Sequence, residues 1–184
     1  MRLRALGLLI AFAAGSAVAQ TALVDAARND DHATAVGLLA ERADPNQAES
    51  DGTTPLHWAV HNDDAELVQR LLAAGANVAA ANDYGATPMS EAAVAANPAV
   101  LRALLDAGAD VDSPNADGQT ALMVVARGGN TAAARTLLEG GATQLTTQIA
   151  LNNGNQLVGE DLILVHSGVQ TIHARRDQIK FQSV

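Results

Sequence analysis

A step of 33 residues recurs through most of this 184-residue chain. Threonines and leucine pairs return at that interval, and glycines follow it at two further positions. Such a period is typical of repeat architectures, in which a small unit buries its apolar face only against its neighbours. We therefore expect a row of similar units. The threonines are Thr21, Thr54, Thr87 and Thr120, and the leucine pairs begin at Leu38, Leu71, Leu104 and Leu137.

Each unit has the signals of two short helices. Thr54 is predicted to cap a first helix that starts with Pro55 and ends near His61. A second helix is predicted over residues 65 to 74, where Gly75 ends it with a left-handed backbone. Residues 77 to 86 then form an extended loop to the next unit. Aromatic residues are only 2% of the chain, and abundant alanine lets such helices pack closely.

Two threonines lack the proline that follows in the clearest units. Thr21 and Thr120 are each followed by alanine. We expect both to act as helix caps all the same, because a threonine side chain at this position can accept a backbone hydrogen bond.

The segment from Asp51 to Ala80, DGTTPLHWAVHNDDAELVQRLLAAGANVAA, closely resembles the ankyrin repeat. The resemblance covers roughly residues 20 to 143. It implies an all-α solenoid of four stacked helix-turn-helix units with short β-turn loops, followed by a non-repeat tail at 144–184. The units cover about 20–49, 50–81, 82–114 and 115–143.

The chain departs from that family at two positions of the unit. The usual Thr-Pro-Leu-His is complete only at Thr54 to His57, and the histidine is replaced elsewhere by Val24, Ser90 and Met123. In the family this histidine braces the loops. The usual glycine between the helices is present only as Gly129, and Asp30, Asp63 and Ala96 replace it. Because alanine tolerates a left-handed backbone poorly, we expect the turn at Ala96 to be reshaped.

The first nineteen residues have the features of a cleavable signal peptide. Arg2 and Arg4 precede an apolar run of about ten residues, and Ala17-Val18-Ala19 is a small-residue cleavage site. We expect cleavage between Ala19 and Gln20 and a periplasmic or secreted mature protein. An uncleaved membrane anchor is the alternative, although the run is short for a bilayer.

The tail from residue 144 no longer follows the period. The segments 161–166 and 169–173, separated by Ser167-Gly168, have the pattern of a β-hairpin. Three interpretations stay open: a specialised cap on the last repeat, a disordered tail, or a changed reading frame or truncation of a longer array.

Charge and composition exclude several classes of function. The formal net charge is −9, and removal of Arg2 and Arg4 with the leader takes it to −11. This is the wrong sign for a general nucleic-acid binder. The chain has no cysteine, which excludes disulfides and thiolate chemistry. No later segment is apolar for long enough to cross a membrane.

The sequence offers little for catalysis. His57 and His61 have the i, i+4 spacing of a zinc pair, but the glutamate of the metalloprotease pattern is missing. No phosphate loop or nucleophile elbow is present. We therefore expect no enzyme, metal or cofactor, and keep a metal-dependent hydrolase only as a remote alternative.

What remains is a surface for binding a protein. Proteins that resemble this one bind partners on a concave face made of loop tips and the exposed side of each first helix. Tyr84 is the best single anchor, and the acidic tips favour a basic partner surface. We expect Trp58 to lie in the core. The positions carried over are Ser50, Asp51, Thr53, His61, Asn62, Asp83, Tyr84, Ala86, Ala116, Asp117, Gln119 and Arg127.

The leading hypothesis is thus a non-catalytic, exported and monomeric protein–protein interaction module. A fragment of a larger exported ankyrin protein, with no independent role, is the second hypothesis.

Overall fold

The computed structural model describes residues 16–142 and four strands within 156–183; side chains are described over residues 22–142. Eight helices alternate with loops over the first of these ranges, as the period predicted. The helices are α1 (Ser16–Arg28), α2 (His32–Ala40), α3 (Pro55–His61), α4 (Ala65–Ala73), α5 (Pro88–Ala95), α6 (Pro98–Asp106), α7 (Ala121–Gly128) and α8 (Thr131–Glu139).

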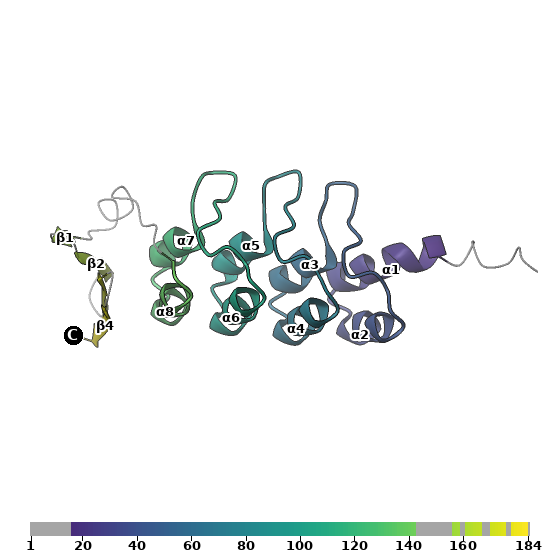
Figure 1. Ribbon diagram of the computed structural model, residues 1–184, viewed down its shortest axis with the longest axis horizontal. Helices are drawn as coiled ribbons and strands as arrows, with labels where there is room; N and C mark the ends of the chain where they lie inside the picture. Colours follow the sequence, from purple (N-terminus) through teal and green to yellow (C-terminus); the bar gives the residue numbers. More distant parts are fainter. Residues whose placement is uncertain (1–15, 143–155, 159–160, 167–169, 176–177, 184) are drawn as a thin grey trace, which may run out of the picture.

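The helices form two rows (Figure 1). The first helices of the units, α1, α3, α5 and α7, pack side by side in one row, and the second helices pack in the other. Loops between the units project together on one side of the stack. The four-unit all-α ankyrin solenoid expected from the sequence is therefore confirmed.

The core runs along the whole stack as a continuous layer of aliphatic side chains. Leu56, Leu101 and Leu122 are among its fully buried members, and small alanines such as Ala59 and Ala92 lie between them. The alanines let neighbouring first helices approach closely. Stability therefore comes from the contacts between units more than from any unit alone.

The leucine pairs are less buried in the first unit than in the other three. In the last three units the first leucine of the pair is fully buried, as at Leu71, Leu104 and Leu137. In the first unit Leu38 and Leu39 are both only partly buried. Among the described elements, α2 packs mainly against α1 and α4.

The predicted threonine caps form on the first helices of the two middle units but not on those of the first and last units. The side chains of Thr54 and Thr87 accept hydrogen bonds from the third residue of α3 and α5, as predicted. Thr120 stands at the N-cap of α7 without a side-chain capping bond. The prediction for Thr21 was wrong, because α1 begins at Ser16 and Thr21 lies inside the helix. The residues on both sides of Thr21 are helical, in an alanine-rich stretch that favours helix.

The turn at Ala96 also differs from our expectation. Ala96 adopts φ 53°, close to the 58° of Asp63 and the 73° of Gly129 at the equivalent positions. The turn therefore keeps the geometry of the other units, and the alanine bears the strain. Arg42, which follows α2, also adopts a left-handed backbone, with φ 67°, at a position where later units have a glycine such as Gly75.

The tail contains a four-stranded antiparallel sheet in the order β1-β2-β3-β4. The segments expected to form a hairpin correspond to β2 and β3, which pair with Leu162 opposite Ala174 and His166 opposite Gln170. Residues 143 to 155, the expected turn at 167–168 and residue 169 lie outside the described residues. The strands are β1 (Gln156–Val158), β2 (Asp161–His166), β3 (Gln170–Arg175) and β4 (Gln178–Ser183).

No helix within the described residues combines the length and the apolar character that a bilayer crossing demands. Most of the predicted leader lies outside those residues, so its expected role is not addressed by this observation.

Candidate functional site

The loops are held rigidly by asparagines at their bases. Asn82 Oδ1 accepts hydrogen bonds from the backbone N–H of Tyr84 at 3.1 Å and of Ala86 at 2.9 Å. Asn115 repeats the arrangement 33 residues later with Asp117 and Gln119. Because a side chain supports the turn from inside, the tip residues are held in place while their own side chains remain free to contact a partner.

Adjacent loops are also joined to each other. The backbone N–H of Asp83 donates to the carbonyl oxygen of Asp51 at 2.8 Å, and Asn82 Nδ2 donates to Thr53 Oγ1 at 3.3 Å. The loop before α3 and the loop before α5 therefore form one continuous rim.

An open hollow of about 270 Å³ lies between this rim and the first helices of the second and third units. Four of the predicted site residues line it: Asp51, Thr53, His61 and Tyr84. Four further residues complete the lining and were not predicted as site residues. These are His57, Trp58, Asn82 and Glu91.

The 33-residue spacing could have identified two of the four lining residues that were not predicted, Trp58 and Glu91. Glu91 is equivalent to Trp58 in the next unit. Trp58 lies one helical turn before His61, a predicted face position, and Glu91 lies one turn before Val94, the equivalent of His61. A helix presents residues i and i+3 on the same side. Extending the predicted face by one turn would therefore have included both residues.

Trp58 lies at the boundary between the core and the hollow, which corrects the expectation that it belongs to the core alone. It is half-buried and packs against buried apolar residues, yet it also lines the hollow. Its indole N–H donates to Glu49 Oε2 at 3.1 Å. The ring of His61 meets it edge-on, with centroids 5.7 Å apart.

His57 braces the loops, and both of its ring nitrogens are engaged. Nδ1 accepts from the backbone N–H of Thr54 at 3.2 Å, and Nε2 lies 3.0 Å from the carbonyl oxygen of Ala86 in the next loop. The neutral tautomer with the proton on Nε2 satisfies both bonds. Burial lowers the pKa of His57 below its usual value. The ring is therefore a neutral structural brace with no nitrogen left to bind a metal.

The described residues contain no group of three or more His, Cys, Asp or Glu side chains that could hold a metal ion. His61, the partner of His57 in the suspected zinc pair, is exposed and has its Nδ1 3.7 Å from Glu91 Oε2.

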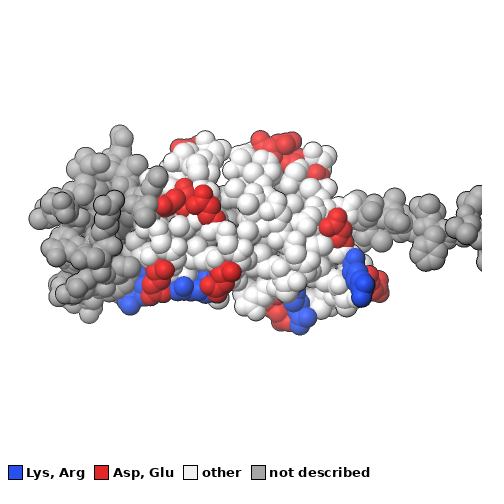
Figure 2. All heavy atoms as spheres, in the orientation of Figure 1, with Lys and Arg blue, Asp and Glu red and all other residues white. Residues whose placement is uncertain are grey.

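The rim is acidic. A hydrogen bond from the backbone N–H of Thr53 lowers the pKa of Asp51, so this carboxylate stays ionised. On the side of the molecule drawn in Figure 2, the loop tips show acidic groups, whereas the positive groups lie along the lower edge beside acids. Residues 20 to 142 contain 17 acids and 6 arginines. This face therefore presents a negative potential to a partner.

The other predicted residues are placed differently. Asn62 is turned away from the face, since its Nδ2 donates to the carbonyl oxygen of Ala27 at 2.8 Å. Thr53 is buried and offers little surface. Ala86 and Gln119 are half-buried at the loop ends. The exposed ones outside the hollow are Ser50, Asp83, Ala116, Asp117 and Arg127.

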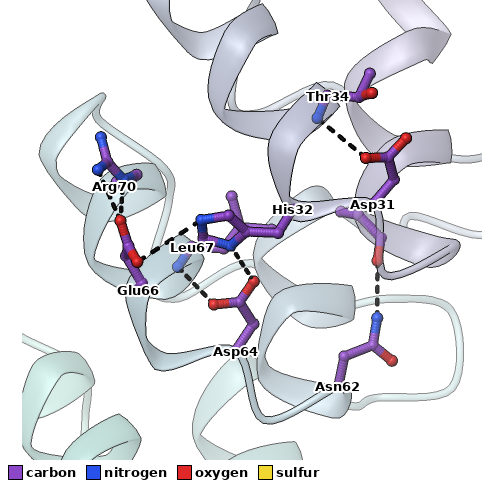
Figure 3. Close-up of polar contacts among 9 residues, drawn as sticks. Asp31, His32, Thr34, Asn62, Asp64, Glu66, Leu67 and Arg70 are labelled. Atoms are coloured by element: carbon purple, nitrogen blue, oxygen red, sulfur yellow. Dashed lines mark hydrogen bonds and ion pairs between the residues drawn. The ribbon is translucent and has the colours of Figure 1, made fainter.

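A second polar cluster joins the first two units on the side of the second helices (Figure 3). His32 Nδ1 lies 2.6 Å from Asp64 Oδ2, and its Nε2 lies 3.7 Å from Glu66 Oε2. Asp64 also caps α4 by accepting from the backbone N–H of Leu67 at 2.9 Å. The hydrogen bond with Asp64 raises the pKa of His32 above its usual value.

Comparison with known proteins gives one clear result. The sequence model for ankyrin repeats, in three copies, matches residues 23–115 and again 91–162. Together these matches span well over half of the chain. No match was found among curated proteins.

Proposed function

Since the chain belongs to the ankyrin repeat family, whose members are general protein–protein interaction modules, we propose that it is an exported, non-catalytic module that binds a partner protein. The binding face is the rim of loop tips and the exposed side of the first helices, with the hollow between the second and third units at its centre.

The observation that carries this proposal is the exposure of Tyr84 above the hollow. Its side chain is 70% exposed, although its backbone is fixed by the bond from its N–H to Asn82. A large ring on a rigid loop offers contact area at a small cost in conformational entropy. Val94 on α5 is 75% exposed and extends the apolar surface on the same unit. Tyrosine in such a position is typical of the residues that dominate binding energy.

Catalysis has little support at this face. The titratable groups of the hollow are two carboxylates, two histidines and the phenol of Tyr84, and the buried histidine already serves as a brace. A general base must reach its substrate with a free lone pair. The hollow is also open, whereas an active site gains from excluding water.

Export is supported by the position of the buried residues of α1 relative to the predicted cleavage site. Among the described side chains of α1, the buried ones are Leu23, Val24, Ala26 and Ala27. Cleavage between Ala19 and Gln20 would remove the first four residues of the helix, Ser16 to Ala19, and leave all of these buried residues in the mature chain. The part of α1 that packs in the core would therefore remain after loss of the leader.

Site-specific photo-crosslinking tests the binding face. A photoreactive phenylalanine analogue replaces Tyr84 in one variant and Gln69, on the exposed side of α4, in a matched control. We expect a discrete adduct with one protein from the Tyr84 position and none from Gln69. Equal adducts from both positions would refute a specific face. A Tyr84→Ala, Asp51→Ala double variant should then fail to capture the crosslinked partner.

Mass measurement of the protein recovered from periplasm and culture medium tests export. The proposal requires an N-terminus at Gln20. A full-length chain found only in the cytoplasm would contradict it and leave the binding face to be judged separately.

A further inference from the structure

We propose that the hollow seats an arginine side chain of the partner, with its guanidinium against the rings of Trp58 and Tyr84 and between the carboxylates of Asp51 and Glu91. This inference rests on the proposed function and adds the chemistry of the occupant. It follows from three separate features of the hollow.

The first feature is a pair of aromatic rings that line one hollow from different units. Trp58 comes from α3, and Tyr84 comes from the loop before α5. A cation over such faces is attracted by the ring quadrupole, and tryptophan is the strongest of the aromatic partners.

The second feature is negative charge in the lining. Asp51, from the loop before α3, and Glu91, from α5, both line the hollow. Asp51 uses Oδ1 to hold the backbone N–H of Thr53 at 2.9 Å. Glu91 is 32% exposed, and its ion-pair contact is with His61 at 3.7 Å. The lining contains no lysine or arginine, so a cation supplied by a partner would balance the charge of its carboxylates.

The third feature is an arginine of the chain itself that lies between a helix and the rim one unit earlier. Arg28 on α1 donates to Asp25 on its own helix and to Glu49 in the loop before α3. Its guanidinium thus bridges helix and rim at the first junction, beside Trp58, whose N–H donates to the other oxygen of Glu49. The residues 33 positions after Asp25, Arg28 and Glu49 are Trp58, His61 and Asn82. The second junction therefore has no arginine of its own at this place, and its carboxylates come from other positions, Asp51 and Glu91.

These features favour arginine over lysine. The planar guanidinium stacks on aromatic rings and binds carboxylates through two N–H groups at once, whereas the ammonium of lysine is a strongly hydrated point charge. An open hollow gives little help in removing water, so the weakly hydrated cation has the advantage.

Trp58 is the single tryptophan of the chain, so all tryptophan fluorescence comes from a residue that lines this hollow. The full mature protein is titrated at low ionic strength with a capped glycine-serine peptide that carries one central arginine. The matched peptides carry citrulline, which has the same shape without charge, or lysine. We expect a saturable fluorescence change with arginine and at least about tenfold weaker binding with citrulline, from the loss of cation–π and ionic contacts.

Three conservative variants locate the site. Asp51→Asn and Glu91→Gln should each weaken the arginine peptide about threefold, and together about tenfold, with no effect on the citrulline peptide. Asn at 51 can still accept the Thr53 hydrogen bond, so the loop should stay folded, as circular dichroism will verify. Asp106→Asn, an exposed acid at the end of α6 and outside the hollow and the rim, is the control and should change nothing.

Equal affinity for arginine and citrulline, or equal weakening by Asp106→Asn, would overturn the inference. A dimer in sedimentation that Tyr84→Ser converts to monomer would also overturn it, because the occupant would then be a second copy. If the arginine peptide does not bind while the Tyr84 crosslink still captures a partner, the proposed binding face is supported and only the arginine inference is wrong. If the peptide binds but no partner is captured, the proposed function fails instead.

Discussion

Replacing His57 by serine isolates the brace between the second and third units. Ser90 stands at the equivalent position one unit later, where its Oγ accepts from the backbone N–H of Thr87 at 2.8 Å. A serine at 57 should therefore keep the cap on α3. It cannot reach the carbonyl oxygen of Ala86, so the substitution removes the bond between the units and the buried ring.

The magnitude follows from those two losses. The hydrogen bond from Nε2 is worth about 0.5–1.5 kcal/mol, because the Ala86 carbonyl oxygen still accepts from the N–H of Asn82. Removing most of a ring that is 3% exposed adds about 1–2 kcal/mol. We expect unfolding to become easier by about 2–3 kcal/mol, which lowers the melting temperature by roughly 5–10 °C in a chain of this size.

The loss should also depend on pH. Burial holds the pKa of His57 below its value of about 6.5 in the unfolded chain. The unfolded state therefore binds the extra proton first, and the stabilisation by His57 is full above that value and falls as the pH falls through it. The difference between wild type and His57→Ser should be largest near pH 8 and smaller near pH 5.

Urea unfolding followed by Trp58 fluorescence and by far-UV circular dichroism measures this difference at both pH values. His61→Ser is the matched control, since it makes the same change on an exposed residue of the same helix and should cost less than about 0.5 kcal/mol. A cost for His57→Ser no greater than the control, or a cost that grows towards acid pH, would refute the reasoning.

Three further predictions concern other positions. Ser90→His should stabilise the array by about 0.5–1.5 kcal/mol by bonding the carbonyl oxygen of Gln119, the equivalent of Ala86; unchanged urea unfolding would show that the loops do not allow the bond. Arg42→Gly should also stabilise, by up to about 1 kcal/mol, because relief of about 1–2 kcal/mol of left-handed strain exceeds the entropy cost of glycine, and thermal unfolding of the variant should shift upwards. His32→Gln should destabilise near pH 6 and have little effect near pH 9. The pKa of His32 is raised by Asp64, so its stabilisation is present below about pH 6.5 and is lost as the pH rises through the folded-state pKa; a pH-independent effect in urea unfolding would contradict this.

The architecture could be predicted from the amino-acid pattern, because each unit carries its own helix caps, apolar stripes and turn residues. The threonine–proline caps before α3 and α5, the apolar stripe of α4 and the left-handed glycine at Gly75 depend on nearby residues. Local signals of this kind can be identified without knowing which units lie side by side. The same spacing indicated which loop tips share one face, including Asp51 and Tyr84.

The arrangement of side chains on that face could not be predicted in the same way, because it depends on contacts between units. Trp58 has the sequence features of a core residue, and it lines a hollow because Glu49 and Arg28 from other segments hold its indole at the rim. Ala96 and Arg42 accept left-handed strain because stacking of their neighbours overrides the local preference. Asn62 has the position of a contact residue, and a carbonyl group 35 residues away turns it inward. These outcomes depend on contacts across the junction between units, and their geometry is set by packing and not by the 33-residue period.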